Sequence, residues 1–394
     1  MNVVDGLLIF CVGMVGIPVF VFSLQVLLAQ SSEQSIDKTS GGRRPRIAVL
    51  MPAHNEELII SSTLQALIPQ LATEDRLLVV ADNCTDNTAV LAAECGATVI
   101  ERHDPNRCGK GYALDFGMQF LAENEPPEVV VILDADCQIE ANCIDILARR
   151  AQSANCPGQA LYVMKAPAGR TVTQAIAEFA WMVKNYVRPL GMMRLGFPCQ
   201  LMGTGMAFPW ALIRKVDLAH GNMVEDMKLG IDLALLGSPP AFCSGALVTS
   251  EFPVSEQVTD NQRKRWEHGH LATIFAETPR LLKAAIKRHD MPLLAMALDL
   301  SIPPLSALAL SLLVMLSLSF LVTFFGSNKA PFILMVILVS LFALAVLAAW
   351  YRFGRERLPF RSLLSVPFYL LRKLPLYFAF FVKRQQSWVK TERR

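Results

Sequence analysis

Two carboxylates that could hold a metal ion stand two residues apart, at Asp134 and Asp136. They directly follow residues 129–133, a short aliphatic run that predicts a buried strand, so both acids would leave the sheet at one point. Carboxylate oxygens are the ligands that Mg²⁺ and Mn²⁺ prefer, and these ions also bind substrate phosphates. The pair therefore favours a metal site for a phosphorylated ligand, although isolated Asp-x-Asp triplets are common.

Three similar apolar runs come earlier in the chain, and longer segments with helical spacing separate them. The predicted strands are residues 47–51, 76–81, 97–101 and 129–133, and the predicted helices are residues 56–70, 87–95 and 111–123. In the first helix an apolar stripe is expected from Leu58, Leu64, Leu67 and Leu71. This alternation predicts an α/β fold with a mostly parallel sheet, which binds ligands at the carboxyl ends of its strands.

Polar residues mark three of these carboxyl ends. The side chains that follow the first two strands are His54, Asn55, Glu56, Asp82, Asn83 and Asp86. Asp and Asn also favour turns and helix caps, which would account for any one of these positions. Acids at successive strand ends instead indicate a binding site that several strands share.

Two further positions could act on a phosphorylated substrate. Lys110 lies in a glycine-flanked loop, where its ammonium group could meet a phosphate or could be solvated at the surface. Glu225 and Asp226 could supply a carboxylate base that takes the proton of an attacking hydroxyl group. Alternatively, these acids begin a helix over residues 227–236, since acids favour the first turn of a helix.

A third group of residues shares one face of a predicted helix. Gln262, Arg265 and Trp266 are spaced i, i+3 and i+4. The indole ring could stack on a sugar or a base, and the guanidinium group could bind a diphosphate and stabilise a leaving group. The other interpretation is an aromatic residue at a membrane interface with a solvated neighbour. His268 and His270 follow without an evident third metal ligand, so we interpret them as polar residues near the site.

Seven motifs follow one another between residues 46 and 266. They are Pro52-Ala53-His54-Asn55-Glu56-Glu57, Val80-Ala81-Asp82-Asn83-Cys84-Thr85-Asp86, Gly109-Lys110-Gly111-Tyr112-Ala113-Leu114, Asp134-Ala135-Asp136, Gly203-Thr204-Gly205, Val224-Glu225-Asp226 and Gln262-Arg263-Lys264-Arg265-Trp266. Together they resemble the motifs of the family 2 glycosyltransferases, which have the GT-A fold. The last three look like the forms seen in cellulose synthase-like and hyaluronan synthase-like members.

The resemblance implies a role for each matching residue. It implies donor binding for Pro52, His54, Asn55, Glu56, Asp82, Lys110 and Asp134, with Asp82 contacting the nucleobase. It implies Mg²⁺ or Mn²⁺ at Asp134 and Asp136, acceptor binding for Gly203, Thr204, Gly205 and Glu225, and catalysis by Asp226 as the base with Gln262, Arg265 and Trp266. Asn83, Cys84, Cys108 and Tyr112 depart from the residues usual in the family and leave the donor sugar open.

The composition places part of the chain in lipid. Hydrophobic residues make up 53% and charged residues 18%, with a mean hydropathy of +0.38. Residues 3–29, 292–325 and 331–351 are long and apolar enough to span a bilayer, whereas Arg372 and Lys373 predict that residues 360–382 lie in the interface with these basic groups among the headgroups. The predicted division is an anchor at 1–30, a linker at 31–45, the α/β domain at 46–280, two transmembrane helices at 281–358, and an interfacial segment with a basic tail at 359–394.

Positive charge gathers on one side of these spans. The flanking basic residues are Arg43, Arg44, Arg46, Lys283, Lys287, Arg288, Arg352, Arg355 and Arg357. They predict a multi-pass protein of the inner or plasma membrane with its α/β domain in the cytoplasm. A net charge of +3 argues against nucleic-acid binding and suits anionic lipids, and nine cysteines without a C-x-x-C pair indicate neither a zinc site nor a disulfide framework.

These features together predict a membrane glycosyltransferase of the hexosyltransferase type. It would move a sugar with inversion from a nucleotide-sugar, in the first place a UDP-sugar, to a lipid-linked or polysaccharide acceptor in cell-envelope or exopolysaccharide synthesis. A processive synthase working with other polysaccharide-export components and a non-catalytic membrane scaffold with a degenerate transferase domain remain alternatives. A nucleotidyltransferase fits less well, because Ala53-His54-Asn55-Glu56 stands where such enzymes carry a glycine-rich basic loop.

Overall fold

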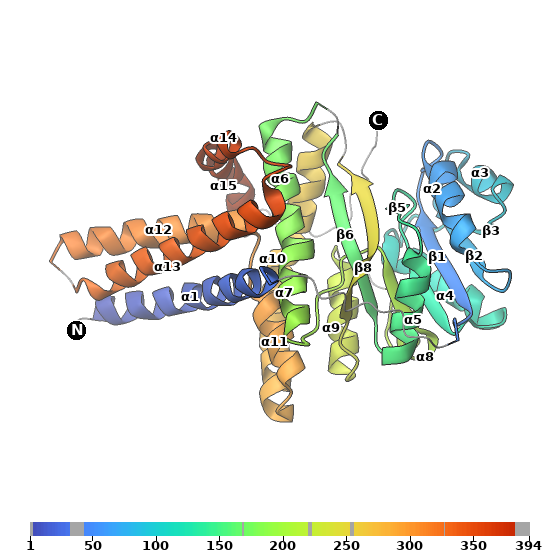
Figure 1. Ribbon diagram of the computed structural model, residues 1–394, viewed down its shortest axis with the longest axis horizontal. Helices are drawn as coiled ribbons and strands as arrows, with labels where there is room; N and C mark the ends of the chain where they lie inside the picture. The colour runs from blue at the N-terminus through green and yellow to red at the C-terminus, as the bar shows by residue number, and fades with distance from the viewer. Residues whose placement is uncertain are drawn as a thin grey trace. The chain divides into compact units, whose positions relative to one another are not determined.

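The computed structural model describes residues 3–31, 43–167, 169–219, 223–252, 256–326 and 328–382 (Figure 1). The chain forms two compact units. The helical unit comprises Met1–Ser32, Ala168–Phe197 and Arg263–Gln385, and the sheet unit comprises Glu33–Pro167, Pro198–Gln262 and Gln386–Arg394. Most of the predicted linker and the basic tail lie outside the described residues. The domain boundaries predicted from the sequence are continuous in the chain, whereas each of these units is made of several segments. Those boundaries therefore remain a prediction.

In its described part, the sheet unit is built on one eight-stranded sheet of order β3-β2-β1-β4-β7-β6-β8-β5. The strands are β1 Ile47–Ala53, β2 Arg76–Asp82, β3 Thr98–Arg102, β4 Val129–Ile132, β5 Gln138–Ile139, β6 Gly158–Lys165, β7 Met206–Pro209 and β8 Ala241–Glu251. β1 to β4 pair in parallel, as does β6 with β8, while β7 and β5 run antiparallel to their neighbours. The four predicted strands and their parallel pairing are therefore confirmed.

Helices cover both faces of this sheet. They are α2 Ile60–Leu67 with the 3₁₀ turn η1 Ile68–Gln70, α3 Thr88–Glu94, α4 Lys110–Glu123, α5 Cys143–Ala154, α8 Trp210–Ile213 and α9 Glu225–Leu235. Leu50 and Val80 of the sheet share a buried core with α4 and α9. Helix α4 lies so close to the sheet that a Cβ atom at Gly117 would approach the Leu50 side chain to 2.4 Å. Aliphatic residues on both strand faces thus place α4, and Lys110 at its start, over β1 and β2.

Two residues of the predicted stripe lie outside α2, since Leu58 precedes the helix and Leu71 follows the 3₁₀ turn in an extended conformation. Leu64 and Leu67 are fully buried, whereas Leu58 is 81% exposed. The helix begins only at Ile60, so Leu58 precedes it and does not share the face set by the helical repeat.

The helical unit contains three apolar helices that are long enough to cross a membrane among the described residues. They are α1 Val3–Ala29, α12 Leu305–Phe324 and α13 Ala330–Ala349, the last extended by a π-helical turn, η3 Trp350–Gly354. The three helices run side by side (Figure 1), and the ring centroids of Phe22 on α1 and Phe342 on α13 lie 5.5 Å apart. This geometry is compatible with the predicted membrane spans.

Shorter helices complete this unit. They are α6 Val172–Met182, the π-helical turn η2 Val183–Val187, α7 Arg188–Arg194, α11 Met291–Leu300, α14 Phe360–Leu363 and α15 Val366–Val382, together with the part of α10 (Glu256–Arg288) from Arg263 onward. The predicted span over residues 292–325 begins too early, because α11 ends at Leu300 and the helix that is long enough to cross a membrane, α12, begins at Leu305. Pro303 and Pro304 lie between them, and proline removes a backbone donor and disfavours a helical residue before it.

Asp299, the acidic residue of the segment 292–325, belongs to a buried polar network. The Asp299 carboxylate accepts from an Arg188 guanidinium nitrogen at 2.8 Å and from Gln25 Nε2 at 2.8 Å. Arg188 Nε also donates to Gln25 Oε1 at 3.2 Å. Buried charges need such partners, so this network ties α1, α7 and α11 together.

The expectation for Lys373 is also wrong. Its side chain is buried and forms an ion pair with Glu267 of α10, while Arg372 is exposed. A basic residue that finds a carboxylate partner inside the protein has no need of a lipid headgroup.

Gly191→Ala should separate α7 from α1. A Cβ atom at Gly191 would lie 2.1 Å from the backbone oxygen of Gln25, so one helix must move and the polar network must stretch. We expect a loss of about 1–3 kcal/mol of stability, measured by thermal unfolding of the detergent-solubilised protein. Gly13→Ala on α1 is the control, because nothing lies within 4 Å of its added Cβ atom. Equal melting temperatures for the two variants would contradict the packing.

Candidate active site

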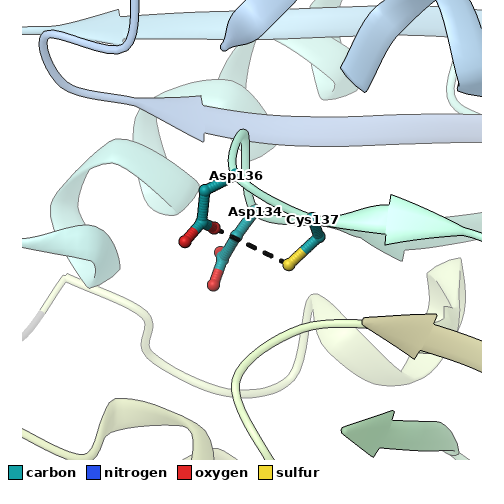
Figure 2. Close-up of side chains that lie close together, drawn as sticks. All are labelled: Asp134, Asp136 and Cys137. Carbon is teal, nitrogen blue, oxygen red and sulfur yellow. Dashed lines mark hydrogen bonds between the residues drawn. The ribbon is translucent and has the colours of Figure 1, made fainter. Parts of the chain in front are cut away.

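The loop after β4 carries Asp134 and Asp136 at the carboxyl end of the sheet. Their carboxylate oxygens and the Cys137 sulfur all lie within 4.8 Å of one another, and both carboxylates extend to the same side of the loop (Figure 2). Two buried threonine hydroxyls hold the loop in place. Thr204 Oγ1 accepts from the Asp134 backbone N–H at 3.0 Å, and Thr63 Oγ1 donates to the Ala135 carbonyl at 2.7 Å. The two acids are thus presented from a rigid turn.

The donor atoms of this cluster fit a hard divalent cation held by oxygen. Burial and the charges of Asp136 and Asp134 raise the pKa of the Cys137 thiol well above its ordinary value. The thiol therefore keeps its proton and points it toward Asp136 Oδ1 at 3.6 Å. Two carboxylates with water and phosphate oxygens suit the hard ions Mg²⁺ or Mn²⁺, whereas a thiol is a soft ligand that suits other metals. Sequence reasoning missed Cys137, although its place directly after Asp136 was the available signal.

Lys110 joins the acid cluster from the first turn of α4. Its ammonium group forms an ion pair with Asp134 and donates to the Gly203 carbonyl at 2.6 Å. Burial by itself would lower the pKa of Lys110, but the charges of Asp134 and Glu225 outweigh burial and raise it above the ordinary value. Lys110 is thus a charged, partly buried group within the cluster and is not solvated at the surface.

The loop at Gly203, Thr204 and Gly205 connects Asp134 with Asp226. Gly203 and Gly205 have φ angles of +94° and +62°, which glycine adopts without strain. A Cβ atom at Gly205 would meet Ala160 and Val248 at 2.8 Å, and one at Gly203 would lie 3.5 Å from Asp226 Oδ2. The two positive φ angles and the close packing at Gly205 therefore favour glycine in this loop, whereas the contact at Gly203 would be an ordinary one.

Glu225 and Asp226 form the first turn of α9, as the helix-start interpretation expected. Burial and the neighbouring charge on Asp226 raise the pKa of Glu225 from 4.5 to about 7, against the opposing charge of Lys110. Glu225 therefore holds a proton near neutral pH far more often than an exposed glutamate does. In this pair Glu225 readily keeps its proton, partly because the charge of the neighbouring Asp226 disfavours a second negative charge.

Asp82 lies at the end of β2 in a second polar group. Its carboxylate accepts from Arg102 Nη1 at 2.6 Å and from Asn83 Nδ2 at 3.0 Å, and its backbone carbonyl lies 2.6 Å from His54 Nδ1. Arg102 was missed by sequence reasoning. It stands directly opposite Asp82 in the β2–β3 register, and its guanidinium carbon lies 5.6 Å from the centroid of the Tyr112 ring.

The remaining residues of the first motif build the turn beside Asp82. Pro52 lies within β1. The Asn55 side chain accepts from the Thr85 backbone N–H at 2.8 Å, and the Glu56 backbone N–H donates to Thr88 Oγ1 at 2.8 Å. These contacts join the ends of β1 and β2, so Asn55 has a structural role whatever it binds.

The Gln-x-x-Arg-Trp residues lie on α10 and divide between the two units. Gln262 is buried and belongs to the sheet unit, while Arg265 and Trp266 belong to the helical unit. There the Trp266 ring packs against Trp181 with 5.0 Å between centroids. His268 Nε2 lies 2.9 Å from the Leu376 carbonyl, so this histidine has a helix-packing partner.

The chain matches a known family over more than half of its length. The family described as "Glycosyltransferase like family 2" matches residues 45–269. A probable glycosyltransferase of Bacillus subtilis, YdaM, is 26% identical over 261 residues, which are 62% of this chain and 60% of that protein. The glucosyl-3-phosphoglycerate synthase of Mycobacterium tuberculosis is 35% identical over 96 residues, which are 23% of this chain and 28% of that protein. The chain thus spans less than two thirds of each relative.

A solved structure shares the fold at low sequence identity. The mannosyltransferase PcManGT from Pyrobaculum calidifontis, in complex with GDP-Man and Mn²⁺, aligns over 97% of this chain and 99% of its own with a TM-score of 0.59 and 16% identity. The fold expected from the sequence, a GT-A-like α/β domain with a mostly parallel sheet, is confirmed by this likeness.

Lys110→Met should tighten the binding of Mn²⁺ in the absence of nucleotide. The ammonium group of Lys110 compensates the charge of Asp134, so a metal must compete with it for that carboxylate. We expect about tenfold tighter binding, or about 1.4 kcal/mol, measured by electron paramagnetic resonance of free Mn²⁺. Lys215→Met, an exposed lysine of the same unit, is the control for net charge. Unchanged or weaker binding in Lys110→Met would contradict this competition.

Glu225→Gln should stabilise the protein at alkaline pH. The folded-state pKa of Glu225 is raised to about 7, so the folded protein binds this proton more tightly than the unfolded chain and loses stability as pH rises from 4.5 toward 7. We expect the free energy of unfolding of the variant to exceed that of the wild type at about pH 8, by on the order of 2 kcal/mol, and to match it at about pH 5, as measured by thermal unfolding at each pH. Asp226→Asn should reduce the same pH dependence. A wild-type stability that is flat across this range would disprove the assignment.

Proposed function

Since the chain belongs to the family described as "Glycosyltransferase like family 2", we propose that it transfers a sugar from a nucleotide-sugar to an acceptor at a membrane surface. The observation that carries the proposal is the cluster of Asp134, Asp136, Lys110 and Glu225-Asp226 at one end of the sheet. This cluster can bind a diphosphate and can also take up a proton, which are the two operations that sugar transfer requires.

We assign the donor to the residues at the ends of β1, β2 and β4. Asp134 and Asp136 would hold Mg²⁺ or Mn²⁺, which when bound supplies positive charge to the donor diphosphate. Lys110 would add its own charge to the phosphate oxygens. Asp82, oriented by Arg102, would accept the N–H of a uracil-type base, and this chemistry favours a UDP-sugar. Pro52, His54, Asn55 and Glu56 shape the turn next to the base.

We assign the chemical step to Asp226. As the acceptor oxygen attacks the anomeric carbon, Asp226 takes the hydroxyl proton. The new C–O bond forms on the face opposite the diphosphate, the bond from the anomeric carbon to the diphosphate oxygen breaks, and the configuration inverts. When Glu225 is protonated, it no longer repels the Asp226 carboxylate. The acceptor would lie along Gly203, Thr204 and Gly205.

The proposal includes three residues of α10, namely Gln262, Arg265 and Trp266. A guanidinium group can stabilise the charge that develops on the departing diphosphate, and an indole ring can stack on a sugar. We propose these roles from the family motif, with Gln262 as a buried anchor of the helix.

The acceptor is proposed from the membrane character of the chain. Three apolar helices of sufficient length and the flanking basic residues support a multi-pass protein with its sheet unit in the cytoplasm. A lipid-linked or growing glycan acceptor, in cell-envelope or exopolysaccharide synthesis, suits such a location. Processive synthesis is the second candidate, and the Gln262-x-x-Arg265-Trp266 pattern favours it. Such a synthase would need other export components as partners, because the three candidate spans in the described residues are few for a polysaccharide channel. A scaffold role is disfavoured because both acidic motifs are intact.

Asp226→Asn should slow transfer strongly while leaving donor binding in place. Loss of the base should lower kcat by about 10²–10⁴-fold with little change in the donor KM. The measurement is nucleotide release from UDP- and GDP-sugars by membranes that contain the protein, with Mn²⁺ and after chelation. Asp232→Asn is the matched control, since Asp232 lies on the same helix and pairs with Lys228. Undiminished release by Asp226→Asn would overturn the base assignment, and undiminished release after chelation would overturn the metal site.

A further inference from the structure

Helix α15 holds both oxygens of the Glu267 carboxylate, which directly follows Trp266 on α10. Lys373 Nζ forms an ion pair with Oε1, and the Tyr377 hydroxyl donates to Oε2 at 2.6 Å. Both donors come from one face of α15, because they are four residues apart on the same helix. A carboxylate held at both oxygens by one neighbouring helix has little freedom to rotate or slide.

This contact is buried, and its chemistry is that of a positioning device. The side chains of Glu267 and Lys373 are only 12% and 7% exposed. Two charges withdrawn from water gain little net stability, and apolar residues of equal volume often serve the fold as well. Burial and the Glu267 carboxylate raise the pKa of Tyr377, so the phenol keeps its proton and remains a donor. The specific benefit of such a buried pair is one defined register between two helices.

Neighbouring contacts extend this register to a membrane helix. The Tyr377 hydroxyl also lies 2.6 Å from Ser306 Oγ near the start of α12. One residue beyond Glu267, His268 Nε2 lies 2.9 Å from the Leu376 carbonyl. Helix α15 therefore contacts α10 at two successive residues and α12 at a third point, all within the helical unit.

We infer that Lys373 and Tyr377 are positioning residues for the glycosyl transfer, acting through Glu267 on the α10 segment that carries Arg265 and Trp266. The inference rests on the proposed function. An α-helix advances 1.5 Å and turns 100° per residue, so a small slip of α10 redirects both side chains. A misplacement of about 1 Å can cost on the order of 10²-fold in rate. Helix α15 would then contribute to function, although Lys373 lies 106 residues from Glu267 in the sequence.

The test compares kinetics and tryptophan packing in the full-length protein in nanodiscs. Tyr377→Phe removes one donor, and the double variant Glu267→Gln with Lys373→Met removes the ion pair without leaving a lone buried charge. We expect at least a tenfold lower kcat with the donor KM within about twofold. Lys373→Arg, which keeps the charge, should retain most activity. Arg372→Met, at the exposed neighbouring position of α15, is the matched control and should behave as wild type.

A second readout reports position independently of activity. The Trp181–Trp266 ring pair, with 5.0 Å between centroids, should give a near-ultraviolet circular dichroism signal that is lost in Trp266→Phe. We expect this signal to diminish in Tyr377→Phe and in the double variant while the melting temperature stays near that of the wild type. Wild-type kcat and an unchanged signal would overturn the inference, and so would a kcat loss that follows the unfolded fraction alone. A changed signal in a protein whose wild type releases no nucleotide would support the positioning of α10 and overturn the proposed function instead.

Discussion

The mutual repulsion of carboxylates at the end of β4 is the constraint on which the sheet unit depends. Asp134, Asp136, Glu225 and Asp226 gather there, and in the described structure Lys110 offsets part of their charge by pairing with Asp134. Burial and Asp226 raise the pKa of Glu225, so a proton offsets a further part. Carboxylates grouped in this way attract added positive charge. That property is what a metal-dependent transfer of a diphosphate-linked sugar requires.

The fold makes this concentration of charge tolerable. Parallel strands with aliphatic side chains on both faces bury their middles, so polar residues collect where the strands end. The turn after β4 is held by the Thr204 and Thr63 hydroxyls, and the positive φ angles of Gly203 and Gly205 bring a backbone carbonyl to Lys110. Asp134 therefore faces the Lys110 ammonium group, and Asp136 faces the Cys137 thiol.

The helical unit uses buried polar contacts for a different purpose. Arg188, Gln25 and Asp299 join three helices, and Glu267 with Lys373 and Tyr377 joins α10 to α15. Apolar helices slide against one another with little change in energy, since one aliphatic contact resembles the next. A hydrogen-bonded charge in an apolar surrounding accepts one arrangement, which sets the register of the helices that carry it.

The sequence by itself determined the parallel strands, the polar residues at their ends, the ordered family motifs and the apolar length of three helices, because each depends on neighbouring residues and a short repeat. Two predictions failed although local signals were present. The prolines Pro303 and Pro304 mark the break before α12, and α2 begins only after Leu58, but in both places the prediction followed the apolar pattern and not the turn residues. Only the tertiary structure decided the partners of Asp82, Asp299 and Glu267. Arg102 meets Asp82 through strand register, and Lys373 meets Glu267 across 106 positions of the chain. The pKa values of Cys137 and Glu225 are raised mainly by burial. Burial depends on atoms that distant segments of the chain bring together, so no local pattern of residues encodes it.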